Sequence, residues 1–353
     1  MEIKMRLDDS IIKTKIIGRR DGERGKRMEK TRNKLLTNGG MVCLLAVISC
    51  ALWGTAFPGI KIGYSLFEIP SGDPRAQILF AGCRFFLSGV LTVLFGSLAA
   101  KKLLKPQKGS WGPILKLCLT QTVLQYLFFY IGLAHASAVK SSIIEGASAF
   151  ITILLVCLFF RQEALTPRKV IGCVLGFAGV VLVNLNGASW DMNMSFTGEG
   201  FILLSIVAAS VSSVQMKNYS RRENPVTLCG YQFICGGFFM AACGFLSGGR
   251  ISHASGQGIA VLVYLAFLSA VAYSIWSILL KYNSVSRVAV WSFTNPIFGV
   301  VFSMLLLAGE KQIFGLQTVA ALVLVSLGIF VVNRTAEQKS SLRESRQPES
   351  ETR

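Results

Sequence analysis

Three charged residues interrupt long apolar stretches of the sequence and are the first candidates for chemistry. Lys61, Arg84 and Glu145 lie in segments long enough to cross a lipid bilayer. A charge within the hydrocarbon costs about 2.5–3.5 kcal/mol on insertion scales, so each one needs a partner, water or a function. Two interpretations stay open. Either Glu145 neutralises Arg84 or Lys61 and locks helices together, or the cluster binds a charged substrate group or carries a coupling proton.

Polar and aromatic side chains in other apolar segments could complete a binding site around these charges. Gln121 and Gln125 are four residues apart, as are Tyr126 and Tyr130, and this spacing places each pair on one face of a helix. Further candidates of the same kinds are Trp53, Tyr273, Trp276 and Asn295. Such groups either form hydrogen bonds between helices or line a cavity. An aromatic, amide-bearing cavity suits an amino acid or another small organic metabolite better than an inorganic ion.

These residues must be positioned by membrane-spanning helices, because the apolar runs are continuous and do not alternate as barrel strands do. About 20 apolar residues cross roughly 30 Å of hydrocarbon. Ten segments qualify: 41–63, 77–99, 112–133, 140–160, 167–185, 198–217, 226–247, 258–281, 285–307 and 313–333. The sequence therefore predicts an all-α membrane protein with ten transmembrane helices. A basic tail at 1–40, which we expect to be disordered, and a charged tail at 334–353 flank them.

Basic residues predict how these helices are oriented. If the N-terminal tail lies in the cytoplasm, the four internal loops on that side carry twelve Lys and Arg residues, and the five opposite loops carry four. The positive-inside rule then places both termini in the cytoplasm. The formal net charge of +18 is accordingly an orientation signal in the cell membrane, and we expect no nucleic-acid partner.

The two halves of the chain resemble each other. Ser137–Lys140 precedes the fourth segment and Ser284–Arg287 precedes the ninth, an offset of 147 residues, and Glu163 and Glu310 follow those segments at the same offset. Because five spans separate the members of each pair, the two halves must be inverted in the membrane. Inverted repeats are typical of secondary transporters, whose substrate site lies where the repeats meet.

Prolines and glycines indicate where helices could bend or pack closely. Pro58 and Pro296 lie inside predicted helices and are candidate hinges, with a static bend as the alternative. Gly172, Gly176 and Gly179 in the fifth segment predict close packing against another helix.

Several short motifs, in their order and spacing, resemble the EamA branch of the drug/metabolite transporter (DMT) superfamily. They are Trp53–Phe57 with Lys61, Arg84–Phe85, the stretch Ser137–Glu163, Leu165–Pro167, and Gly309–Glu310. The resemblance implies two five-helix repeats, 41–185 and 198–333, inverted around a central cavity that helices one to four and six to nine would line. One position departs from the family pattern: Ala149 stands in the fourth helix where family members often carry proline.

Other function classes find little support in the sequence. All five Asp residues lie in tails or loops, the two His residues are far apart, and the nine Cys residues form no CxxC spacing. No GxxxxGK[ST] phosphate-binding loop occurs either, so we expect no cofactor and no metal.

We therefore expect a secondary transporter that moves a small organic metabolite, amino acid-like or drug-like, by alternating access. The resemblance implies that it is an exporter. The expected partners are the small-molecule substrate, the lipid bilayer, a coupling proton and a second copy of the chain in a homodimer. A polytopic membrane enzyme or a sensor without transport activity is the alternative.

Overall fold

The computed structural model describes most of the chain, in ranges separated by gaps. They are 29–70, 72–136, 141, 144–184, 195–251, 254–306 and 316–344. The described residues are helical or irregular, and no β-strand occurs among them. Some residues of the sequence predictions lie outside these ranges: 1–28, Lys140, His253, Gly309 and Glu310. The chain divides into two compact units, residues 1–43 and 44–353.

The first unit holds a helix over residues 29–37 and the beginning of α2 (Gly39–Leu66). Asn38 separates the two, because its side-chain oxygen accepts hydrogen bonds from the backbone N–H groups of Gly40 (3.0 Å) and Met41 (3.3 Å). Asparagine is among the residues favoured at this position, since its side chain satisfies amide groups that have no partner within the helix. The rest of α2 belongs to the second unit.

Seven helices in the described part of the chain are long and apolar enough to cross a membrane. They are Gly39–Leu66, Pro74–Ala100 (α3), Lys108–Leu133, Phe196–Tyr219, Pro225–Leu246 (α10), Gly256–Tyr282 (α11) and Val285–Leu306. Two shorter apolar helices are Ser148–Phe159 and Val319–Arg334. The protein is therefore an integral membrane protein, and the described part of it is all-α. Ten spans and an inverted repeat stay predictions.

The third and fourth helices of the sequence prediction change geometry along their length. In the third, α4 (Trp111–Leu117) passes into the π-helical segment Cys118–Leu124 before α5 (Gln125–His135) begins. In the fourth, α7 (Ser148–Leu154) passes into the π-helical segment Leu155–Phe159. Short π-helical segments interrupt the regular hydrogen bonds of a helix and are frequent at functional sites.

The sixth and ninth helices are irregular as well. A π-helical segment, Phe196–Gly200, precedes α9 (Phe201–Tyr219). The ninth is formed by α12 (Val285–Ala289), the 3₁₀ segment Val290–Thr294 and α13 (Asn295–Leu306). A 3₁₀ stretch in the middle of a helix often marks a hinge or local strain.

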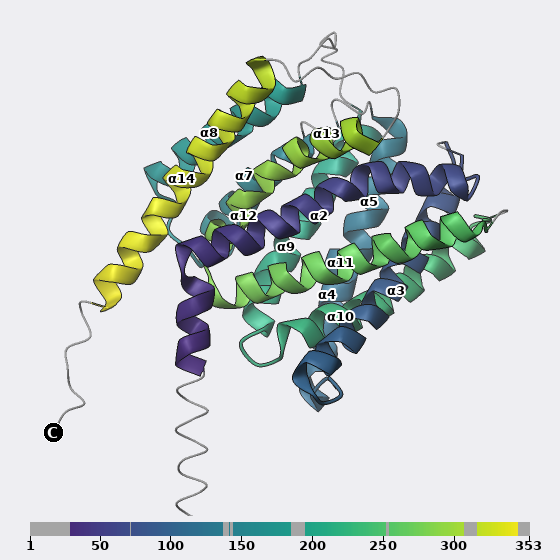
Figure 1. Cartoon of the computed structure of the whole chain (residues 1–353), viewed down its shortest axis with the longest axis horizontal. Helices are drawn as coiled ribbons and strands as arrows, with labels where there is room; N and C mark the ends of the chain where they lie inside the picture. Colours follow the sequence, from purple (N-terminus) through teal and green to yellow (C-terminus); the bar gives the residue numbers. More distant parts are fainter. Residues whose placement is uncertain are drawn as a thin grey trace, which may run out of the picture. The chain divides into compact units, whose positions relative to one another are not determined.

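Glycines allow α3 and α10 to pack with their backbones in contact (Figure 1). A Cβ atom on Gly82 would lie 2.2 Å from the backbone nitrogen of Ala241, and one on Gly237 would lie 2.1 Å from that of Phe86. Any larger residue at either glycine would therefore force the two helices apart. These helices form a closely packed pair within the second unit.

A second glycine contact joins α8 (Pro167–Asn184) to α14 (Leu316–Glu344), which runs alongside it (Figure 1). A Cβ atom on Gly172 would lie 2.7 Å from the carbonyl oxygen of Gly328, and one on Gly179 would lie 2.8 Å from that of Ala321. The close packing predicted for the glycines of the fifth segment is thus confirmed.

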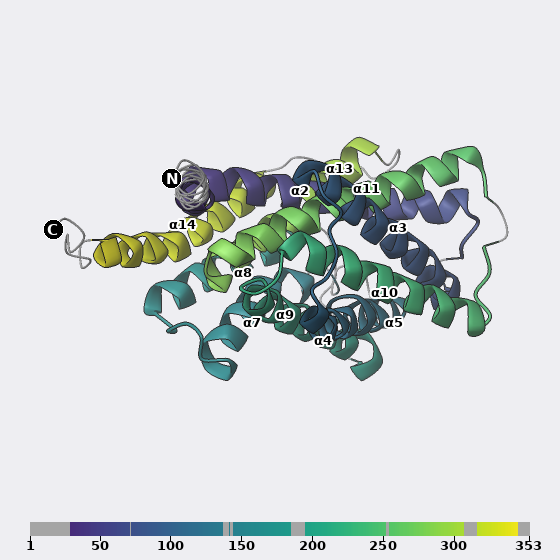
Figure 2. The ribbon, with the colours of Figure 1, turned by 90° about the horizontal axis from the view of Figure 1, so that it is seen from below.

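Large apolar side chains are exposed on many of these helices, whose ribbons Figure 2 shows from a second direction. Leu98 is 66% exposed, Phe159 74%, Phe238 67% and Leu305 73%. Contiguous apolar surface of this kind is unfavourable in water and favourable against lipid chains. The exposure therefore matches the membrane location that the sequence predicts.

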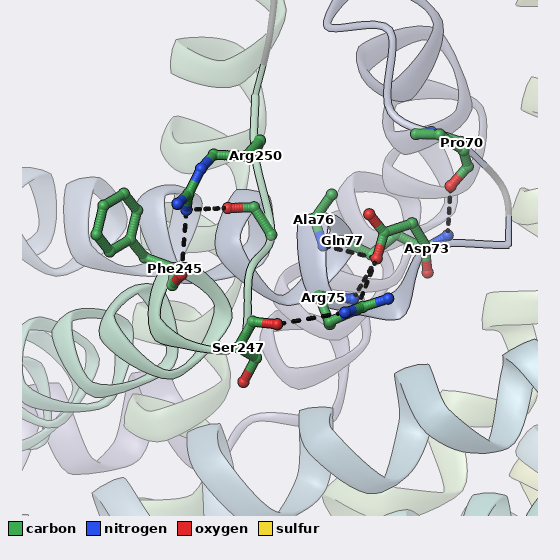
Figure 3. A network of polar contacts seen from close by, with 9 residues as sticks. Pro70, Asp73, Arg75, Ala76, Gln77, Phe245, Ser247 and Arg250 are labelled. Atoms are coloured by element: carbon green, nitrogen blue, oxygen red, sulfur yellow. Dashed lines mark hydrogen bonds and ion pairs between the residues drawn. The ribbon is translucent and has the colours of Figure 1, made fainter.

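Two arginines satisfy carbonyl groups at the end of α10 (Figure 3). Arg75 Nη1 donates to the Ser247 carbonyl oxygen at 3.4 Å, and its Nε lies 3.6 Å from Asp73, the residue that caps α3. Arg250 Nη1 donates to the Phe245 carbonyl oxygen at 3.2 Å, and the guanidinium carbon lies 4.6 Å from the centre of the Phe245 ring. These contacts tie the start of α3 to the end of α10.

Glu223 joins the loop between α9 and α10 to the loop that follows α3. Its Oε2 accepts hydrogen bonds from the N–H of Gln107 (2.9 Å) and the hydroxyl of Ser110 (2.7 Å), and its Oε1 accepts one from the N–H of Asn224 (2.8 Å). Burial by itself would raise the pKa of Glu223, but these hydrogen bonds outweigh it and lower the pKa below its usual value.

We expect Glu223→Gln to lower the free energy of unfolding at neutral pH by about 1.5–3 kcal/mol, the contribution of hydrogen bonds to a charged group. Because the folded-state pKa lies below the unfolded value of about 4.3, the carboxylate stabilises the fold above that pH. The contribution is lost as the pH falls through the folded-state pKa. Melting curves in detergent, recorded from neutral to acidic pH, should therefore converge for the two proteins. A difference that stays constant with pH would contradict this account.

Candidate functional site

Helices of the second unit line a cavity of about 220 Å³, and most of the site residues predicted from the sequence border it. Those that line it are Trp53, Arg84, Gln121, Gln125, Tyr126, Glu145, Tyr273, Trp276 and Asn295. They come from α2, α3, the third helix, the helical residues 144–146 before α7, α11 and the start of α13. Residues far apart in the sequence thus share one polar and aromatic space inside a membrane protein.

Lys61 does not line the cavity. Trp53, Phe57 and Ile60 face it from α2, at the spacing of one helical face, whereas the Lys61 side chain is exposed. Each residue of an α-helix is turned about 100° from the one before it, so the residue after Ile60 points away. The sequence predicted the depth of Lys61 in the membrane but not the direction of its side chain.

Arg84 is a buried cation without an anionic partner among the described residues. It is 3% exposed, and its Nε and Nη2 atoms donate to the same oxygen, Ser269 Oγ, at 3.2 and 2.8 Å. The guanidinium carbon lies 5.1 Å from the centre of the Phe85 ring. A buried charge is costly unless it is paired and hydrogen-bonded. A neutral hydroxyl satisfies part of the guanidinium and leaves its charge uncompensated.

Glu145 lies just before α7, borders the same cavity and is half-buried. Ser205 of α9 borders the same cavity. In the part of the chain that the structure describes, no ion pair joins Glu145 to Arg84. The cavity therefore contains one cationic and one acidic side chain that do not neutralise each other directly.

Aromatic rings form one wall of the cavity. The Trp53 ring lies 5.0 Å from those of Tyr273 and Trp276, edge to face in both pairs. The hydroxyl groups of Tyr126 and Tyr273 are 2.6 Å apart, and the Tyr126 ring lies 4.3 Å from Phe85. Edge-to-face and offset pairs of this kind fix ring positions. The wall is thus a preformed apolar surface with hydroxyl groups at one edge.

Three residues that line the cavity each have a buried polar atom without a hydrogen-bond partner among the described residues. The atoms are Trp53 Nε1, Gln121 Oε1 and Asn295 Oδ1. Gln121 lies in the π-helical segment of the third helix, and Asn295 directly follows the 3₁₀ segment of the ninth. An unmade hydrogen bond at a buried group costs about 1–3 kcal/mol. Three buried polar groups beside the cavity thus lack a hydrogen-bond partner among the described residues.

The two candidate hinges lie in different surroundings. Pro58 is inside α2, one residue after the cavity-lining Phe57. Pro296 is the second residue of α13, where its fixed φ suits the first turn of a helix, and the 3₁₀ segment precedes it. In the fourth helix, a turn at Ala147, two residues before Ala149, interrupts the helix without proline.

Hydroxyl groups from α7 and α9 also line the cavity, and sequence reasoning did not single them out. They belong to Ser148, Thr152, Ser205, Ser210, Ser212 and Ser213. The Thr152 and Ser210 hydroxyl oxygens are 2.7 Å apart. Serines that recur after seven residues, such as Ser205 and Ser212, share one helical face, and this signal could have found them. It is weak, because serine in a helix often bonds to its own backbone.

Comparisons with known proteins give a consistent result. A family model described as "EamA-like transporter family" matches residues 40–185 and 196–334. An uncharacterized transporter of Archaeoglobus fulgidus is 28% identical over 290 residues, which cover 80% of this chain and 96% of that protein. The uncharacterized transporter YvbV of Bacillus subtilis is 26% identical over 323 residues, covering 90% and 96%. A solved crystal structure with 18% identity matches 85% of this chain and 99% of its own with a TM-score of 0.66, a likeness of fold alone.

Proposed function

We propose a substrate class and a transport cycle for this chain, which belongs to the EamA-like transporter family. The resemblance seen in its motifs is confirmed, and the relatives it matches over most of their length are named transporters. The protein is thus an integral membrane transporter. Its substrate, direction and cycle are the subject of the proposal.

The substrate that the cavity fits best is a small organic molecule with a carboxylate or similar anionic group and an apolar or aromatic body. The observation that carries this proposal is the buried Arg84 guanidinium, which has no anionic partner among the described residues and borders the cavity. A substrate carboxylate would pair with it, and planar guanidinium groups are well suited to that geometry. The aromatic wall around Trp53 would then hold the apolar body.

The size and polarity of the cavity favour an amino acid-like substrate. Its volume of about 220 Å³ is smaller than the cavities of roughly 300–1,000 Å³ that hold drug-sized ligands. Glu145 supplies an acceptor for an ammonium group or a carrier for a coupling proton. Gln121 and Asn295 also line the cavity and add amide groups to its polar surface.

The proposed cycle is alternating access between two inverted five-helix repeats, with ten spans and both termini in the cytoplasm of a cell-membrane exporter. The irregular segments of the third, fourth and ninth helices border or adjoin the cavity and support such a motion. In transporters, interrupted helices near the middle of the membrane commonly form the substrate site.

Flux measurements in reconstituted liposomes test this function. Radiolabelled phenylalanine would be followed in both directions, with and without a proton gradient. Phenylacetate, which lacks the amine, and phenethylamine, which lacks the carboxylate, would be added as competitors. We expect saturable phenylalanine flux, strong competition by phenylacetate and weak competition by phenethylamine. Flux no greater than in empty liposomes for phenylalanine and for a panel of other amino acids would refute the proposal.

A further inference from the structure

The connection between α11 and α12 forms one boundary of the cavity. Asn283 and Ser284 make this connection, and two residues that flank it, Leu280 and Val285, line the cavity. Val285 is fully buried and Leu280 is 2% exposed. A displacement of the α11–α12 connection would therefore open the cavity at this end, which the positive-inside rule predicts to be cytoplasmic.

Glu163 holds the connection from the side of the fourth and fifth helices. Its Oε1 accepts a hydrogen bond from the backbone N–H of Ser286 at 3.2 Å, and its Oε2 accepts one from Lys169 Nζ at 2.9 Å. The side chains of this ion pair are only 12% and 10% exposed. A carboxylate oriented by a buried lysine thus reaches across to the start of α12.

The charge state of Glu163 favours this contact at neutral pH. Burial by itself would raise the pKa of Glu163, but hydrogen bonds from Ser286 and Lys169, together with the positive charge of Lys169, lower it below its usual value. The carboxylate is therefore ionised at neutral pH and keeps its hydrogen bonds.

Lys217 holds the same connection from α9. Its Nζ donates to the carbonyl oxygens of Asn283 and of Leu280, the latter at 3.3 Å. Arg287 Nη1 donates to the Asn283 side-chain oxygen at 3.3 Å and so stiffens the connection itself. The backbone on both sides of the connection is thus fixed by charged side chains from two other parts of the fold.

We propose that Glu163 and Lys217 are positioning residues that hold the α11–α12 connection closed over the cytoplasmic end of the cavity, and that release of their hydrogen bonds opens this end. The proposal rests on the transport cycle proposed above. It assigns a function to two residues that touch neither the cavity nor the substrate, and it identifies the closed end of the cavity in this structure.

Glu223 offers a matched comparison. Like Glu163 it is a glutamate with several hydrogen bonds that tie two loops on the same side of the predicted bilayer. Its partners, Gln107, Ser110 and Asn224, do not line the cavity. Replacing either glutamate weakens a loop contact, but only the replacement of Glu163 releases the α11–α12 connection that borders the cavity.

The experiment measures access to the cavity from each side of the membrane, using a charged methanethiosulfonate reagent as the probe. Ser292, which lines the cavity, would be replaced by cysteine in the wild-type background and in E163Q, K217M and E223Q. Right-side-out and inverted vesicles expose one face each to the reagent. Peptide mass spectrometry reads modification at position 292, so the nine native cysteines can stay in place.

We expect E163Q to increase the labelling rate from the cytoplasmic face about 10-fold, the equilibrium shift that follows from losing one charged hydrogen bond. Labelling from the outer face should fall, because molecules that open to the cytoplasm are withdrawn from the fraction that is open to the outside. K217M should act in the same direction, and it provides the test if E163Q does not fold. E223Q should label as the wild type does from both faces.

Equal rates in E163Q, K217M and the wild type would overturn the proposal. So would an increase from both faces together, or the same change in E223Q, since each indicates general loosening of the fold. Phenylalanine flux measured in parallel separates this result from the proposed function. Wild-type flux with unchanged labelling in E163Q refutes only the gate, whereas shifted labelling without any flux refutes only the substrate.

Discussion

Arg84→Met should reduce phenylalanine transport about 100-fold, equivalent to about 3 kcal/mol of lost substrate interaction. The reason is that Arg84 is the buried cation of the cavity and has only the Ser269 hydroxyl as a hydrogen-bond partner in the described structure. The same substitution should leave the melting temperature in detergent unchanged or raise it, because an uncompensated buried charge destabilises the fold. Loss of transport with preserved stability would distinguish substrate binding from a structural role.

Two further substitutions make this result interpretable. Arg84→Lys keeps the charge but loses the planar, two-pronged donor geometry, so we expect a smaller loss of transport. Arg75→Met removes an exposed arginine from the start of the same helix and should leave transport unchanged. Wild-type transport by Arg84→Met, or a loss of transport that parallels a loss of stability, would show that the guanidinium does not bind substrate.

Glu145→Gln should abolish accumulation driven by a proton gradient and spare exchange of labelled for unlabelled phenylalanine without a gradient. The amide keeps the size of the side chain, but it cannot take up or release a proton. Exchange requires only binding and reorientation, whereas accumulation requires coupling to the proton. Both fluxes can be measured in one liposome preparation by changing the external pH.

Ser205→Ala is the matched control for this prediction, because it removes a hydroxyl group that borders the same cavity and leaves the Glu145 carboxyl group in place. We expect it to retain accumulation driven by the gradient. If Glu145→Gln accumulates phenylalanine as the wild type does, with the same pH profile, Glu145 is not the coupling residue. If it loses exchange as well, its role is substrate contact.

The sequence predicted the residue types of the candidate site well, because charges and amides are conspicuous in apolar helices. Arg84, Glu145 and Gln121 were identified in this way, and all three line the cavity. Lys61 was identified in the same way but does not line the cavity. The sequence gives the position of a residue along a helix, whereas the direction of its side chain depends on how the helix is packed. Family membership and membrane location were likewise predicted from motifs and apolar runs, and both are confirmed.

Other features had no clear signal in the sequence. The 3₁₀ segment Val290–Thr294 and the π-helical segment Cys118–Leu124 contain neither Gly nor Pro, the residues that most often signal a break in a helix. The turn at Ala147 could not be predicted, because no proline lies near it in the sequence. The partners of Glu163 come from positions 6 and 123 residues away, and only the fold brings the second one close.

The contact between α3 and α10 has a practical consequence. Because Gly82 and Gly237 place the two backbones against each other, this pair of helices can hardly slide or separate without breaking the contact. Spin labels attached to the outer faces of the two helices should keep a constant separation throughout turnover. The labelled pair would provide a constant reference, and distances from it to labels on other helices would report how far those helices move.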